Sequence, residues 1–141
     1  MESLTFDTLP DGALLLMDSA PIVYFLEAHS KLSKLFKPLF ERHTAGALHF
    51  AVTTVSIAEV LTGPLQSRDE ALAERYLAIL KSWQVVDLTL EIAESAARLR
   101  ASLRLKLPDA VQAASAIAIN ADALITYDRD FSRVAALRVL P

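Results

Sequence analysis

Short apolar segments that alternate with helical patterns constrain the fold of this chain more than any other feature of its sequence. The segments 13–17 (ALLLM), 47–52 (ALHFAV) and 123–126 (ALIT) have the length of strands and are almost wholly apolar. Strands covered by helices on both faces have this composition, and the alternation of strands with helices is typical of a parallel sheet. We therefore expect a three-layer α/β/α domain with a mainly parallel central sheet.

Periodicity and helix-breaking residues place the remaining elements. Two shorter strands are predicted over 83–88 and 137–140. Helices are predicted over 19–30, from 32 onward, and over 55–63, 68–82, 90–104 and 108–120. The helix over 55–63 is expected to end at Gly63-Pro64, and Pro108 places the start of the last helix near Asp109.

The composition limits the number of domains and the chemistry. A chain of 141 residues, 53% of them hydrophobic, fits a single domain over 1–141, with 1–12 as an N-terminal extension. The absence of cysteine excludes a disulfide framework, a thiolate zinc site and a cysteine nucleophile. The three glycines form neither a GxGxxG nor a Walker A pattern. A net charge of −3 argues against a protein that coats nucleic acid, but leaves open a nuclease with an acidic metal site.

The location of the protein is predicted from what the sequence lacks. The stretch MESLTFDTLPDG at the start carries acids where a signal peptide carries Lys or Arg. No apolar stretch reaches the length that a membrane-spanning helix requires. We therefore expect a cytoplasmic protein with no membrane partner.

Acidic residues follow two of the predicted strands. Asp18 comes directly after the first strand, and Asp128 and Asp130 follow the strand over 123–126. The carboxyl ends of parallel strands lie at one edge of a sheet, where functional residues collect. Two strands that are far apart in sequence are therefore expected to bring acids to the same edge.

Each acid also has a purely structural interpretation. Asp18 is a favourable residue for capping the next helix, and the DxD pattern at 128–130 is common in surface turns. Glu59 forms a possible capping box with Ser56, and Asp109 forms one with Gln112. Taken one at a time, the acids leave both interpretations open.

Taken together, the acids indicate a metal site. Carboxylates that gather closely raise one another's pKa unless a cation lies between them. Mg²⁺ prefers a few carboxylates together with waters and phosphate oxygens. Because cysteine is absent and the histidines lie far from the acids in sequence, Mg²⁺ or Mn²⁺ is favoured over Zn²⁺.

Four motifs resemble a known family in their order and spacing. The stretches LLLMDSAPIVYFLE, TTVSIAEVLTGP, LKLPDAVQAASA and ALITYDRDF resemble the acidic motifs of PIN-domain ribonucleases, most closely the VapC-type toxins of bacterial toxin–antitoxin pairs. The resemblance covers about residues 13–140. It implies that four acids are catalytic: Asp18, Glu59, Asp109 and Asp128. It also implies that Asp18, Asp109 and Asp128 are the metal ligands, with Glu59 binding directly or through water.

The resemblance assigns auxiliary roles as well, with one departure. Asp130, Thr126 and Ser19 match auxiliary positions of the site. Many members of the family have Asp-Thr-Asn in the first motif, whereas this chain has Asp18-Ser19-Ala20. Ser19 retains a hydroxyl that can donate a hydrogen bond, and Ala20 has lost that ability.

The resemblance implies a Mg²⁺- or Mn²⁺-dependent endoribonuclease that leaves 5′-phosphate and 3′-hydroxyl ends. It further implies the toxin of a type II toxin–antitoxin system, with RNA as substrate, a small cognate antitoxin and a homodimer. The alternative is a catalytically weak PIN-like module that only binds protein.

Other residues admit two interpretations each. Arg104, Lys106 and Arg129 lie near the acidic motifs and are candidates for RNA phosphate contacts, or else belong to solvated helix faces. The histidines are candidates for metal-free RNA cleavage, although core or surface roles are favoured: His29, His43 and His49. The aromatic residues are expected mostly in the core, with part of that surface open to a partner's helix: Tyr24, Phe25, Phe36 and Phe40.

Overall fold

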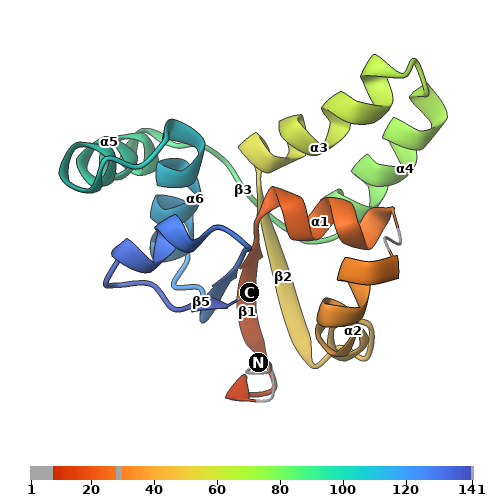
Figure 1. Cartoon of the computed structure of the whole chain (residues 1–141), viewed down its shortest axis with the longest axis horizontal. Coiled ribbons are helices and arrows are strands. Elements are labelled where there is room, and N and C mark those ends of the chain that lie inside the picture. Colours follow the sequence, from red (N-terminus) through yellow and green to blue (C-terminus); the bar gives the residue numbers. More distant parts are fainter. Residues whose placement is uncertain (1–7, 28–29, 141) are drawn as a thin grey trace.

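The computed structural model describes residues 8–27 and 30–140 (Figure 1). In chain order the elements are β1 Ala13–Met17, α1 Ser19–Leu26, α2 Ser30–Thr44, β2 Leu48–Thr53, α3 Thr54–Gln66, α4 Glu70–Lys81, β3 Gln84–Val86, α5 Leu90–Leu103, α6 Leu107–Ala118, β4 Ala123–Ile125, the short 3-10 helix η2 Arg129–Arg133, and β5 Val139–Leu140.

The described strands form one sheet in the order β3-β2-β1-β4-β5, and every neighbouring pair is parallel. In the register of the central strands, Leu15 lies beside Phe50, and Leu16 lies beside Leu124. Strand β1 is therefore paired on both sides, and four of its five residues are buried. This confirms the parallel sheet that the apolar runs predicted.

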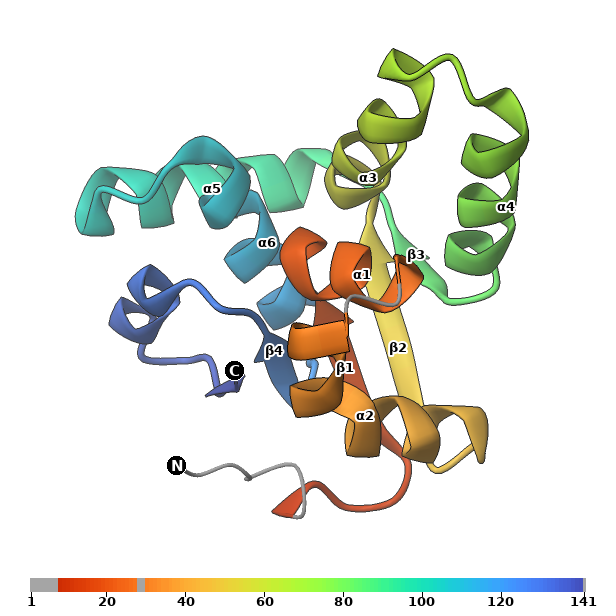
Figure 2. The ribbon, with the colours of Figure 1, turned by 45° about the vertical axis from the view of Figure 1, so that its right-hand side comes forward.

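Helices cover both faces of the sheet, as Figures 1 and 2 show. Leu15 and Met17 of β1 pack in a cluster with residues of α1 to α4, among them Ile22 and Val60. Leu16 points to the opposite face, where its cluster is made with α5, α6 and η2. Successive residues of a strand face opposite sides, so one apolar strand supplies both cores. The three-layer α/β/α prediction is confirmed.

Helix α3 does not end at Gly63-Pro64 as predicted, and continues to Gln66. Proline usually excludes a helical residue before it because its ring clashes with that residue's Cβ atom. Gly63 has no Cβ atom, so this clash is reduced. Pro64 is buried, and Ser67 donates a backbone hydrogen bond to the Gly63 carbonyl at 3.1 Å.

Neither of the two possible capping boxes forms. Thr53 caps α3, accepting from the Ser56 backbone at 3.0 Å, so Ser56 and Glu59 lie inside the helix. Helix α6 begins at Leu107 with Lys106 at its cap position, and Asp109 lies within its first turn. Neither Glu59 nor Asp109 is therefore a helix cap, and both side chains are available for other contacts.

Some predictions fall on residues outside the described part of the chain: 1–7 of the N-terminal extension, His29, and the side chain of Phe36. Of the remainder of the extension, Leu9 is buried in the core. Within the described residues, none of the helices combines the length and apolar character needed to cross a bilayer.

Candidate active site

A cavity of about 350 Å³ lies at the carboxyl edge of the sheet. Strands β1, β2 and β4 all end there, and α3 and α6 begin there. The residues that line it are Asp18, Ser19, Ala20, Glu59, Pro108, Asp109, Gln112, Thr126, Tyr127 and Asp128. The structure thus brings the four predicted catalytic acids, from four separate segments of the chain, into one cavity.

Asp18 is held by two hydrogen bonds, one to each carboxylate oxygen. Gln112 Nε2 donates to Oδ1 at 2.9 Å, and Thr126 Oγ1 donates to Oδ2 at 2.7 Å. The side chain makes no capping hydrogen bond to α1 although Asp18 occupies the cap position. The carboxylate is therefore directed into the cavity rather than used to begin the helix.

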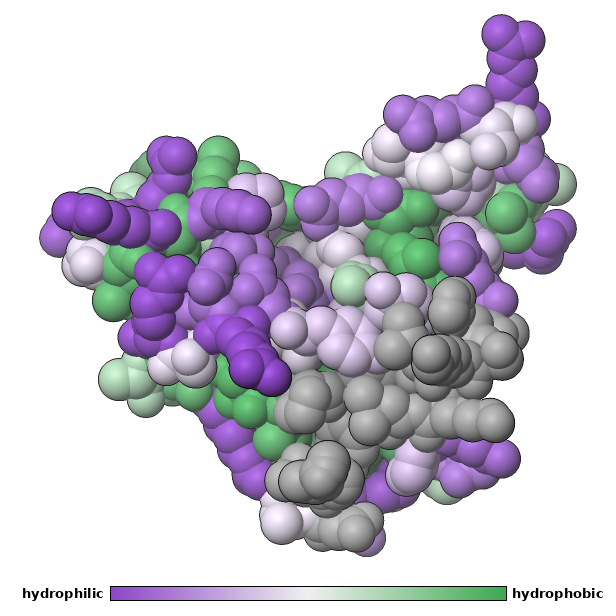
Figure 3. Space-filling model, viewed as in Figure 1, coloured by the Kyte–Doolittle hydropathy of each residue, from purple (hydrophilic) through white to green (hydrophobic). Residues whose placement is uncertain are grey.

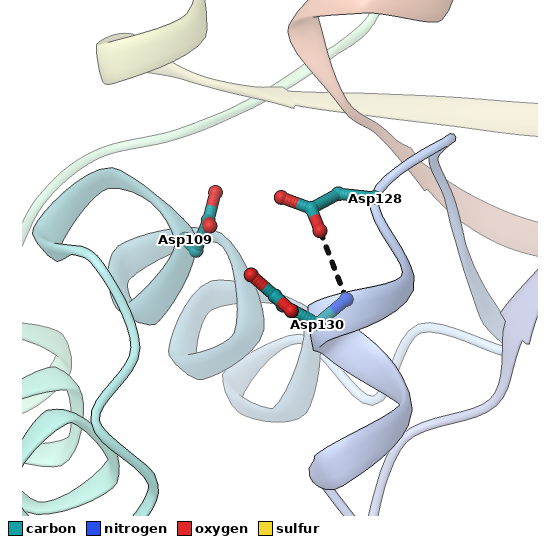
Figure 4. Close-up of side chains that lie close together, drawn as sticks. All are labelled: Asp109, Asp128 and Asp130. Atoms are coloured by element: carbon teal, nitrogen blue, oxygen red, sulfur yellow. Dashed lines mark hydrogen bonds between the residues drawn. The ribbon is translucent and has the colours of Figure 1, made fainter.

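Asp130 does not line the cavity but lies close to two of the acids that do, Asp109 and Asp128. The carboxylates of Asp109, Asp128 and Asp130 converge between the start of α6 and η2 (Figure 4), and each offers an oxygen within 4.8 Å of the others. Asp128 Oδ1 also accepts from the Asp130 backbone at 2.9 Å, so it caps η2 as well. Asp130, predicted as auxiliary, belongs to this closest group.

The neighbouring acids change the pKa of Asp109. Its pKa is raised to about 6, first by burial, then by the charges of Asp128 and Asp18 and by a hydrogen bond with Asp128. Lys106 opposes the shift. Without a cation, Asp109 therefore holds its proton up to about pH 6. A divalent cation removes this repulsion, and oxygen ligands of this kind suit Mg²⁺ or Mn²⁺.

Glu59, Ser19 and Tyr127 also line the cavity. Glu59 is exposed, and Ser19 Oγ donates a hydrogen bond to its Oε1 at 2.6 Å. The hydroxyl that Asp18-Ser19-Ala20 retains at its second position therefore contacts an acid of the site. Burial, and to a smaller extent Tyr24, raise the pKa of Tyr127 to about 12. Its phenol therefore stays neutral at physiological pH.

The predicted cations lie outside the cavity. Arg104 lines a separate groove with Arg100 and Leu105, and Arg129 lines a groove that shares Thr126, Tyr127 and Asp128 with the cavity. Lys106 is exposed next to α6. Hydrophilic side chains gather over α6 and η2 on the face shown in Figure 3. Arg129 thus adjoins the cavity, whereas Arg104 ends α5 and Lys106 precedes α6.

The described histidines take no part in the cavity. His43 stacks on Phe50 with ring centroids 3.9 Å apart, and His49 is exposed on β2. Phe25 packs against Phe40 in the core, at a centroid distance of 4.2 Å. These residues have the core and surface roles that were favoured for them.

The sequence did not predict a role for Gln112 in the site, because its spacing from Asp109 also matches a capping box. It is 1% exposed and touches Asp18, Thr53 and Ser56. One signal was present: Gln112 is a polar residue within the apolar stretch AVQAASA, three positions after Asp109. Residues three apart share a helix face, so this amide belongs on the side of the acid.

Residues 15–137 match the model of the PIN domain family. The chain belongs to the PIN domain family. The predicted resemblance to this family is confirmed, and no curated protein sequence matches the chain.

Solved structures share the fold at low sequence identity. A toxin–antitoxin complex from Klebsiella pneumoniae has 23% identity and a TM-score of 0.71, over 90% of this chain and 96% of that one. VapBC2 from Rickettsia felis, bound to a promoter DNA fragment, has 22% identity and a TM-score of 0.72, over 90% and 97%. VapC20 of Mycobacterium tuberculosis, a Sarcin-Ricin loop cleaving toxin, has 16% identity and a TM-score of 0.68, over 85% and 94%. The VapC-type resemblance is thus confirmed for the fold.

Proposed function

We propose that this chain is a metal-dependent endoribonuclease and the toxin of a type II toxin–antitoxin pair. The observation that carries the proposal is the convergence of Asp18, Glu59, Asp109 and Asp128 in one cavity of about 350 Å³. Membership of the PIN domain family and the fold shared with VapBC structures support it. The proposed metal ligands remain Asp18, Asp109 and Asp128. Asp130 offers an oxygen within 4.8 Å of Asp109 and Asp128, so it is close enough to join those two.

The donor set fits Mg²⁺ or Mn²⁺. The cavity offers carboxylate oxygens, no thiolate, and an acid whose pKa is raised to about 6 by burial and by its acidic neighbours. When bound, such an ion lowers the pKa of a coordinated water and stabilises charge on a phosphate. Asp18 is oriented for this role by Gln112 and Thr126.

The remaining residues would bind and orient RNA. Glu59 lies exposed in the cavity, where it can contact the site directly or through water. Arg129 lies in the groove adjoining the cavity, and Arg104 and Lys106 flank the start of α6. Their charges would attract the RNA backbone from both sides of the acids, without selecting sequence.

The partners of the chain are part of the proposal. The structural neighbours include toxin–antitoxin complexes, which favours a small cognate antitoxin for this chain. A homodimer and a cytoplasmic location stay predictions from the sequence. The alternative of a catalytically weak protein-binding module is separated from the nuclease by the assay below.

The test is cleavage of structured RNA by purified protein with Mn²⁺. We expect cleavage by the wild type and by Asp87→Asn, an exposed acid after β3 that does not line the cavity. Asp18→Asn and Asp109→Asn should be inactive, and EDTA should stop the reaction. Undiminished cleavage by both site variants would reject the mechanism. A wild type that binds Mn²⁺ without cutting any RNA would favour the binding module.

A further inference from the structure

We propose that Gln112 is a positioning residue that orients two acids of the site, Asp18 directly and Glu59 through Ser56 and Ser19. The inference rests on the proposed function, because the acids that Gln112 orients are those of the proposed metal site. Gln112 lies on α6 three residues after Asp109 and is 1% exposed. A buried amide must find hydrogen-bond partners, so its partners define what it does.

All the hydrogen-bonding groups of the Gln112 amide are used. Thr53 Oγ1 donates to its Oε1 at 2.6 Å. Its Nε2 donates to Asp18 Oδ1 at 2.9 Å and to Ser56 Oγ at 3.0 Å. The side chain thereby links the end of β2, the first turn of α3 and the acid after β1.

The amide has only one favourable orientation. Thr53 Oγ1 accepts from the Ser56 backbone at 3.0 Å, which leaves its hydroxyl proton for Gln112 Oε1. A flipped amide would place Oε1 against the Asp18 carboxylate, so that two acceptors would face each other. The cap of α3 therefore fixes which end of Gln112 meets Asp18.

The same amide reaches Glu59 through two hydroxyls. Ser19 Oγ lies 2.9 Å from Ser56 Oγ and 2.6 Å from Glu59 Oε1. A hydroxyl has one proton and a carboxylate only accepts, so we assign the Ser19 proton to Glu59. Ser56 then donates to Ser19 and accepts from Gln112 Nε2. Each hydroxyl donates once, so the series of hydrogen bonds runs from the Gln112 amide at one end to the Glu59 carboxylate at the other.

This series separates the effects of two substitutions. Replacing Gln112 by an apolar residue of similar length removes the hydrogen bond that Nε2 donates to Asp18 and the one that it donates to Ser56. Replacing Ser19 by alanine removes the contacts with Glu59 and Ser56 but leaves both hydrogen bonds of Asp18 in place. Partners that orient metal ligands typically change metal affinity or activity by about 10- to 100-fold.

The main experiment is titration of Gln112→Met with Mn²⁺ alone, followed by electron paramagnetic resonance. We expect the Mn²⁺ dissociation constant to rise about 10- to 100-fold and kcat for RNA to fall, while KM changes less than about threefold. The matched control is Ser115→Ala, a residue of the same helix that is also 1% exposed and does not line the cavity. It should bind Mn²⁺ like the wild type.

The outcomes distinguish this inference from the proposed function. If the wild type cleaves RNA and Asp18→Asn does not, but Gln112→Met binds Mn²⁺ as tightly as Ser115→Ala, the positioning role is overturned and the nuclease stands. If the wild type neither binds Mn²⁺ nor cleaves RNA, both fail. A circular dichroism spectrum without metal checks that each variant is folded.

A second set of variants applies even where Gln112→Met does not fold. Ser56→Ala and Ser19→Ala both interrupt the series that leads to Glu59. The double variant should therefore bind Mn²⁺ as weakly as the weaker of the two single variants. Additive weakening would show that the two hydroxyls act independently, and would overturn the series.

Discussion

The two sides of the acidic cavity are stabilised in opposite ways. On one side, each oxygen of Asp18 accepts a hydrogen bond from a neutral donor, Gln112 or Thr126. On the other, Asp109 faces Asp128 and Asp130, and burial and neighbouring acids raise its pKa to about 6. One side is ordered by hydrogen bonds of the fold. On the other side Arg133 pairs with Asp130 at 2.9 Å, but the charge of Asp128 still opposes that of Asp109, and a cation can relieve this repulsion.

This difference indicates how such a site can be both ordered and receptive to metal. A fully hydrogen-bonded carboxylate keeps its geometry, since its partners are themselves buried in the protein. Thr126 joins the two sides, because its Oγ1 donates to Asp18 and accepts from the Asp128 backbone at 3.0 Å. The comparison predicts that substitutions on the two sides change stability in opposite directions.

The largest expected effect is stabilisation by Mn²⁺, which acts on the repulsive side. Mn²⁺ at about 100 times its dissociation constant should raise the free energy of unfolding by about 2.7 kcal/mol. Urea unfolding with and without Mn²⁺ measures this. The variant Asp87→Asn should keep the effect and Asp109→Asn should lose most of it. Equal stabilisation of both variants would place the ion elsewhere.

Removing the ordered acid should destabilise the metal-free protein. Asp18→Ala deprives Gln112 and Thr126 of a charged acceptor, a loss of about 2 kcal/mol after allowing for water that enters the open cavity. Urea unfolding in EDTA measures the change, with Asp87→Ala as the exposed control. A variant as stable as the wild type would mean that the two hydrogen bonds do not order this side.

Thr126 tests the link between the two sides. Thr126→Val keeps the shape of the side chain but removes its donor to Asp18 and its acceptor for the Asp128 backbone. We expect a loss of about 1 to 1.5 kcal/mol in the free energy of unfolding. Thr126→Ser, which keeps the hydroxyl, should recover most of it. If serine and valine behaved alike, methyl packing rather than hydrogen bonding would explain the residue.

The sequence predicted those parts of the fold and site that depend on local pattern. Apolar runs identified β1, β2 and β4, and the rule for parallel sheets placed Asp18 and Asp128 at one edge. Helix starts were harder, because Thr53, Thr54 and Ser56 are all plausible caps within four residues. The choice of cap residue decides whether Glu59 belongs to a capping box or lines the cavity.

The buried amide could not be assigned from local pattern. Gln112 is separated by 59, 94 and 56 residues from Thr53, Asp18 and Ser56 respectively. Its role depends on three segments meeting, which no local spacing encodes. The closeness of Asp130 to Asp109 could not be predicted either, because it depends on how η2 lies relative to α6.

The smallest expected effect is also the one with the opposite sign. Asp109→Asn should stabilise the metal-free protein at pH 7.5 by on the order of 1 kcal/mol, after discounting for solvent screening. The folded pKa of Asp109, about 6, lies above its ordinary value of 3.8, so the folded state holds the proton more tightly. The contribution of Asp109 to the free energy of unfolding of the wild type is therefore fully present below about pH 4 and is lost as the pH rises to about 6.

Asparagine has no proton to lose, so the advantage of the variant should grow between pH 4 and 6 and stay constant above that range. Urea unfolding in EDTA at several pH values measures this difference, with Asp87→Asn expected to show none. A variant less stable than the wild type at pH 7.5 would mean that Asp109 is held by favourable contacts, as Asp18 is. The two sides of the cavity would then be alike, and repulsion would no longer favour the binding of a cation there.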